Sequence, residues 1–124
     1  MEHQKAKIDE GKPRLSLVPT AIIPAIASVR EFGNKKYKDP DSWQTVDPKR
    51  YIDALLRHTV KFVDEPLGKD KESGLPHLWH MACNVAFLCS AYKSGKLKKS
   101  LGTTAKKKHI RIENEKCRKE RNAR

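Results

Sequence analysis

The chain has 124 residues, and 27 Lys and Arg against 15 Asp and Glu give it a formal charge of +12. That length suits one domain, in which folding buries roughly two-thirds of the surface that the unfolded chain exposes. No apolar run approaches the roughly 20 residues that cross a bilayer, and the segment Met1–Lys5 lacks the apolar core of a signal peptide. We therefore expect neither a membrane-spanning nor an exported protein, and we expect polyanions as partners.

The cysteine content indicates a reducing environment. There are three cysteines, Cys83, Cys89 and Cys117, and their spacings match no metal-binding motif. Because an odd number at such spacings does not form a disulfide framework, a cytoplasmic location is predicted.

The first part of the chain is predicted to be an extended arm followed by a short helix. Residues 7–19 contain one Gly, two Pro and no helical period, so they favour an arm. Apolar residues then recur at helical spacing: Ile22, Ile23, Ile26, Val29 and Phe32. Since Gly33 can supply a left-handed stop, we expect the first helix over about 21–32 and an ordered loop over 35–43.

Two further helices are predicted, and the last of them is the most apolar. The dipeptide Asp47-Pro48 combines a good N-cap residue with proline at the first helical position, which indicates a second helix over about 48–64. The third helix is expected over about 75–92. Its apolar residues, Leu78 and Val85 among them, surround most of the helix, so we expect it to be central and buried. No strand-period pattern competes, and the predicted fold class is all-α with a small three-helix core.

The basic charge is concentrated at the C-terminal end. Residues 93–124 hold 13 Lys and Arg and three acids, whereas the first 92 residues are nearly balanced. Large apolar residues are too few to order this segment, so we predict a domain over 1–92 and a basic tail over 93–124 that is flexible or, from about Lys106, helical. The tail either contacts nucleic acid nonspecifically through phosphates or keeps the protein soluble.

Histidines mark the strongest candidate for a metal site. Three polar residues share one stripe of the predicted third helix at i, i+3 and i+7: His77, His80 and Asn84. His58 lies on the preceding helix, and the short turn between the two favours antiparallel packing that brings it to the same stripe. With the nearby acids Asp70 and Glu72, these imidazoles would suit Zn²⁺, Mn²⁺ or a similar metal. Alternatively, they are hydrogen-bonded histidines that hold the two helices together.

Cations and aromatic residues suggest a second kind of site. Asp53, Arg57 and Lys61 follow one another at i, i+4 and i+8, either as a solvated face with an ion pair or as groups that receive phosphates and hold a hydrated Mg²⁺. Further cations lie close to glycines: Lys12, Arg14, Lys35 and Lys36. Tyr37 and Trp43 would either stack on a base or cap the core.

Four motifs in this order resemble a family that is common in phages and prophages. They are Gly11-Lys12-Pro13-Arg14-Leu15-x-Leu17-Val18-Pro19, Phe32-Gly33-x-Lys35-Lys36-Tyr37, Tyr51-x-Asp53-Ala54-Leu55-x-Arg57-His58 and Glu72-Ser73-Gly74-Leu75-Pro76-His77-x-x-His80. The family is the dATP/dGTP diphosphohydrolase N-terminal domain, and the resemblance spans about residues 5–92. It implies a small helical domain that acts on purine deoxynucleoside triphosphates with a divalent metal (Mg, Mn, Co or Zn) in the cytoplasm of an infected cell.

The resemblance also implies roles for the residues singled out above. Helical pyrophosphatases that hold Mg²⁺ with Glu-x-x-Glu pairs, and phosphohydrolases with an adjacent His-Asp, differ from this chain, which has neither motif. The implied metal ligands are therefore His58, His77, His80 and Asp70, with Asp53 and Glu72 as catalytic acids. The implied substrate-binding residues are Lys12, Arg14, Lys35, Lys36, Tyr37, Arg57, Lys61 and Asn84.

Three functions remain open from the sequence. The first is an enzyme that hydrolyses dATP and dGTP to monophosphate and pyrophosphate. The second is a non-catalytic protein that binds a nucleotide or, through its tail, nucleic acid. The third is an interaction protein in which the apolar third helix forms a homo-oligomer face.

Overall fold

The computed structural model describes residues 7–102, 115–116 and 118–122, and it confirms the all-α class. The elements in chain order are the 3-10 turn η2 (Leu15–Leu17), α1 (Ile22–Tyr37), the 3-10 turn η3 (Ser42–Thr45), α2 (Pro48–Asp64), α3 (His77–Ser94) and α4 (Lys96–Leu101). This described part contains no β-strand, only an isolated bridge between Lys69 and Pro76. None of its helices has the length and apolar content needed to cross a membrane.

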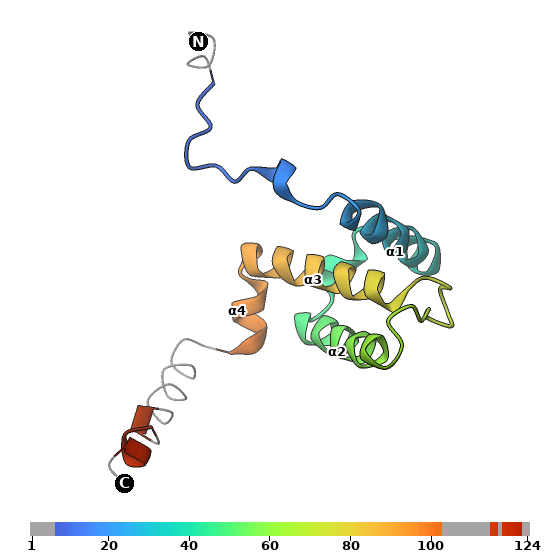
Figure 1. The fold of residues 1–124 in the computed structure, drawn as a ribbon. Coiled ribbons are helices and arrows are strands. Elements are labelled where there is room, and N and C mark those ends of the chain that lie inside the picture. The colour runs from blue at the N-terminus through green and yellow to red at the C-terminus, as the bar shows by residue number, and fades with distance from the viewer. Residues whose placement is uncertain (1–6, 103–114, 117, 123–124) are drawn as a thin grey trace.

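The helices are arranged around α3. Figure 1 shows α3 between α1 and α2, with the N-terminal arm leading away from the helical body. Both α1 and α2 pack along α3, but they make hardly any contact with each other, and α4 folds back against α3 and α2. This packing leaves a gap between α1 and α2, and α3 forms the bottom of the gap.

The first helix continues beyond its predicted end at residue 32. Gly33 lies inside α1, and the helix stops only at Lys38, which takes the left-handed conformation (φ 61°) and donates its backbone N–H to the Asn34 carbonyl (2.7 Å). The prediction was wrong because a glycine inside a helix costs only about 1 kcal/mol relative to alanine. Consequently Lys36 and Tyr37 belong to the last turn of α1 and not to a loop.

The second helix has its predicted bounds, and its start is tied to α4. The Asp47 carboxylate accepts the backbone N–H of Lys49 (3.0 Å), as expected for an N-cap. The same carboxylate accepts a hydrogen bond from the Ser100 hydroxyl of α4 (2.5 Å), and Lys96 donates to the Gln44 carbonyl. The folded body therefore extends to Leu101, past the predicted boundary at residue 92. The expectations for residues 103–114, and for Cys117, lie outside the described residues, whereas 115–116 and 118–122 are helical.

The third helix is central, but it is not covered on every side. Its buried residues include three polar ones, His77, His80 and Asn84. Leu78 and Val85, which were predicted to be core residues, are 47% and 45% exposed. The prediction failed because α1 and α2 cover only part of the helix. Within the described chain, the buried apolar residues are few and small: Ala25, Pro48, Cys83 and Ala91.

Candidate functional site: a pocket between the first two long helices

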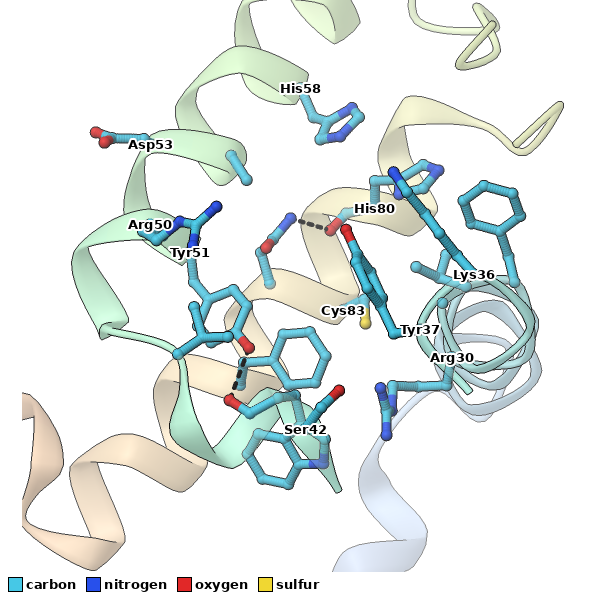
Figure 2. Close-up of a pocket in the computed structure, with 18 of the residues that line it drawn as sticks. Arg30, Lys36, Tyr37, Ser42, Arg50, Tyr51, Asp53, His58, His80 and Cys83 are labelled. Carbon is cyan, nitrogen blue, oxygen red and sulfur yellow. Dashed lines mark hydrogen bonds between the residues drawn. The ribbon is translucent and has the colours of Figure 1, made fainter. Parts of the chain in front are cut away.

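A pocket of about 640 Å³ fills the gap between α1 and α2. Side chains from α1, η3 and α2 form its walls, and α3 forms its floor (Figure 2). Since α3 places Asn84, Cys83 and Phe87 along this floor, the most buried helix of the fold supplies the residues at the bottom of the pocket. The size is within the range of small-molecule and nucleotide sites.

One end of the pocket is aromatic. The Trp43 ring stacks on Phe87 with 5.1 Å between ring centroids and an interplanar angle of 23°, and the Tyr51 ring lies 4.6 Å from that of Phe87. The Tyr51 hydroxyl donates a hydrogen bond to the Trp43 carbonyl (2.7 Å), which fixes η3 against α2. This end is therefore a cluster of aromatic rings, the type of side chain on which nucleobases stack.

Arg30 holds the aromatic end together. Its guanidinium lies 5.3 Å from the Phe87 ring centroid and 5.9 Å from that of Trp43, and it donates a hydrogen bond to the Pro40 carbonyl (2.5 Å). A cation over two aromatic faces is stabilised by their negative electrostatic potential. Arg30 therefore fixes the loop after α1 above the pocket, a role that the sequence analysis did not predict.

The other end of the pocket is lined by His58 and His80, and His77 lies next to His58. His58 of α2 stacks on His80 of α3 with ring centroids 4.5 Å apart and an interplanar angle of 8°. His58 also faces His77, with 2.9 Å between the two Nδ1 atoms. Asn84, one turn along α3, donates its side-chain amide to the His80 carbonyl (2.8 Å). The predicted convergence of the three histidines is confirmed.

The turn between α2 and α3 supplies an acid beside His58 and His77. The Asp70 carboxylate accepts the backbone N–H groups of Glu72 (3.1 Å) and Ser73 (2.9 Å), and the turn closes where Gly74 adopts a φ of 74°. The Ser73 hydroxyl accepts the Leu75 N–H and shares a 2.7 Å hydrogen bond with His80 Nε2. These bonds hold Asp70 and His80 in fixed positions beside His58.

Burial sets the protonation of these groups. Loss of water, reinforced by the nearby His80, lowers the pKa of His58 from 6.5 to about 4, and burial also lowers the pKa of His80. Burial alone would raise the pKa of Asp70, but the N–H donors of Ser73 and Glu72 and the nearby His80 outweigh it, so that this pKa is lowered. At neutral pH the site therefore presents a neutral His58 imidazole and an ionised Asp70 carboxylate.

Three of the predicted metal ligands form one group. Single ligand atoms of His58, Asp70 and His77 all lie within 4.8 Å of one another. Two imidazoles and one carboxylate fit Zn²⁺, Mn²⁺ or Co²⁺ better than Mg²⁺, which prefers oxygen ligands. His80 is not part of this group, and its Nε2 shares a hydrogen bond with the Ser73 hydroxyl.

Other predicted site residues divide into those at the pocket and those away from it. The residues that line it are Lys36, Tyr37, Asp53, Arg57 and Asn84. Lys36 forms an ion pair with Glu72 (2.5 Å), and Glu72 itself does not line the pocket. Asp53 is exposed, and Figure 2 shows its carboxylate directed away from the pocket centre.

The remaining four predicted cations do not line the pocket. Lys12 and Arg14 lie on the exposed arm, Lys35 is exposed on α1, and Lys61 is exposed on α2 one turn beyond Arg57. In their place the pocket contains Arg30 and Arg50, which the sequence analysis missed. Phe87 was also missed, although it follows His80 and Asn84 on the same helical stripe, and this spacing was a usable signal.

Comparisons with known proteins agree with the predicted resemblance. Residues 2–101 match the family described as dATP/dGTP diphosphohydrolase, N-terminal. Over 82 residues the chain is 33% identical to a protein of Salmonella phage PMBT28 named dATP/dGTP diphosphohydrolase. The match covers 66% of this chain but only 28% of that relative, so most of the phage protein has no counterpart in the match. No solved structure is significantly similar to the chain.

Proposed function

The chain belongs to the dATP/dGTP diphosphohydrolase N-terminal family, and from that premise we propose that it hydrolyses dATP and dGTP to monophosphate and pyrophosphate with a divalent metal in the cytoplasm. The observation that carries this proposal is the pocket, in which cations lie between an aromatic end and an end lined by His58 and His80. The His58–Asp70–His77 group adjoins that second end through His58. These two ends match the two chemically different parts of a nucleotide, the base and the polyphosphate.

In this proposal the base occupies the aromatic end. Trp43, Tyr51 and Phe87 offer the stacking surface, and a purine, with two fused rings, covers more of that surface than a pyrimidine. The phosphates then extend towards Lys36 and Arg57, which line the pocket between the aromatic residues and the histidines. Lys36 would exchange its exposed Glu72 partner for phosphate oxygens, a charge-assisted bond of the same kind.

The histidine end would hold the metal. A divalent ion held by His58, His77 and Asp70 would supply Lewis-acid polarisation of a phosphate and lower the pKa of water. The turn amides fix the Asp70 carboxylate for this role. His80, positioned by Ser73 and neutral at pH 7, can accept a proton, while Arg57 and Lys36 neutralise charge that develops on the phosphates. We assign Glu72 the positioning of Lys36, with which it forms an ion pair.

Product analysis tests the proposed reaction. The purified chain is incubated with each dNTP and Mg²⁺, Mn²⁺, Co²⁺ or Zn²⁺, and products are separated by anion exchange. We expect dAMP, dGMP and pyrophosphate, with turnover falling at least about 100-fold in Arg57→Ala and His58→Ala. Lys61→Ala is the matched control, because Lys61 lies one turn from Arg57 but does not line the pocket. Absence of turnover with every metal would overturn the hydrolase proposal.

A second candidate function is nucleotide binding without catalysis. It is favoured by the single carboxylate in the His58–Asp70–His77 group and by the small share of the phage relative that the chain covers. The aromatic end and the cations need no metal to bind a purine nucleotide. Saturable dATP or dGTP binding in equilibrium dialysis, with no products formed, would support this candidate over the enzyme.

A further inference from the structure

The third helix has the composition of a helix that is covered on all sides. Among its 18 residues, Lys93 is the only Asp, Glu, Lys or Arg. A helix that is apolar around its circumference is normally buried. In the single chain, however, Leu78, Val85 and Tyr92 are 47%, 45% and 78% exposed. They follow one another at steps of seven residues, so they form one stripe along an uncovered side of α3.

The second helix carries a matching stripe. Leu56, Val60 and Val63 are 57%, 62% and 71% exposed, at steps of four and three residues. On α2, Leu56 and Val63 lie on the flank away from Arg57 and His58, and Val60 lies at the edge of this stripe, on the side of Asp53. Because α2 and α3 pack against each other in antiparallel directions, their stripes fall on the same side of the pair. Together the six side chains form an apolar face opposite the pocket, which we call the back face.

The exposed apolar area of the back face is close to the area that each partner buries in a stable protein–protein interface. From their exposed fractions, the six side chains present on the order of 700 Å² per chain, against roughly 800 Å² per partner in a standard stable interface. The described part of a single chain has only four buried apolar residues, all of them small, so its own core is small. Burial of the back face would therefore add substantially to the apolar surface that the fold removes from water.

We propose that the back face binds the back face of a second copy of this chain, giving a symmetric four-helix arrangement of two α2–α3 pairs. Steps of three, four and seven residues on both helices are the spacing of side chains that interlock between packed helices. The face is uncharged and self-complementary, as a two-fold interface requires. Both pockets would remain open, since they lie on the outer sides of the pair.

The oligomeric mass tests this proposal with charge substitutions. Sedimentation equilibrium of the full chain from about 1 to 200 µM should give twice the 14.2 kDa of one chain. Val60→Glu and Val85→Glu should each give the mass of a single chain, because dimerisation would bury an unpaired carboxylate. Ile23→Glu is the matched control: Ile23 is 63% exposed on α1, away from the back face, and its variant should remain a dimer.

A crosslinking measurement covers the case in which the glutamate variants fail to fold. Cys89 is exposed on α3 between Val85 and Tyr92. In a Cys117→Ser chain, a short bis-maleimide should link two copies through Cys89, and Cys89→Ser should abolish the link. A wild-type mass of one chain throughout the range, absence of the crosslink, or dissociation by Ile23→Glu but not by Val60→Glu and Val85→Glu would each overturn the proposal. Because none of these readouts involves nucleotides, their failure is separate from failure of the proposed function.

Discussion

His58 makes the stability of the fold depend on pH. Its pKa is 6.5 in the unfolded chain and about 4 in the folded one. Between pH 6.5 and 4, His58 is protonated in the unfolded state but mostly neutral in the folded state. The contribution of His58 to the free energy of unfolding is therefore largest above pH 6.5 and decreases as the pH falls towards 4. We expect thermal midpoints to follow this course, and His58→Gln to flatten it in part, since His80 also has a lowered pKa. A variant curve parallel to that of the wild type would contradict this account of His58.

Replacement of Asp70 should weaken metal binding without disrupting the fold. Asp70→Asn keeps an oxygen that can accept the Ser73 and Glu72 N–H groups, so the turn should remain closed. It removes the only carboxylate of the group with His58 and His77. Calorimetric titration with Zn²⁺ or Mn²⁺ should show a loss of affinity of at least about tenfold. Asp64→Asn, at the exposed end of α2, is the control, and equal affinity in the two variants would refute the assignment.

Arg30 links α1 to the loop that closes the aromatic end of the pocket. Arg30→Met keeps an unbranched apolar stem but removes the bond to the Pro40 carbonyl and the charge over Phe87 and Trp43. We expect a loss of about 1–3 kcal/mol of unfolding free energy in urea denaturation. Lys35→Met, an exposed position on the same helix, should change it little. An Arg30→Met chain as stable as the Lys35→Met chain would show that this contact does not hold the loop.

At the level of elements, features that depend on a short segment could be predicted from the sequence, whereas contacts between packed helices could not. The Asp47 cap and the histidine spacing are properties of short segments, so both the start of α2 and the convergence of the histidines followed from the sequence. The end of α1 did not, because Gly33 is a weak stop inside a helix with further contacts. Arg30 and Phe87 meet only through the packing of α1 on α3, which no local pattern encodes.

For the whole molecule, the boundary of the folded body predicts how truncations behave. A chain that ends at Gly102 keeps α4 and its contact with Asp47, so its thermal midpoint should equal that of the full chain. This truncated chain loses 9 of the 27 basic residues. It should therefore bind a DNA column more weakly than the full chain and elute at a lower salt concentration. A chain that ends at Gly95 lacks α4 and should melt at a clearly lower temperature. Equal midpoints for the two truncations would mean that α4 contributes nothing to the fold.

The central claim is that one pocket takes a purine at its aromatic end and phosphates at its histidine end. The most direct measurement uses a Trp79→Phe chain, in which Trp43 is the only tryptophan and reports on base stacking. Titration with dGTP should change its fluorescence saturably, and Arg57→Ala should weaken dGTP binding at least about tenfold while leaving the weaker binding of deoxyguanosine unchanged. A Trp43 signal that does not respond to dGTP, or an Arg57→Ala effect equal for nucleotide and nucleoside, would contradict the claim.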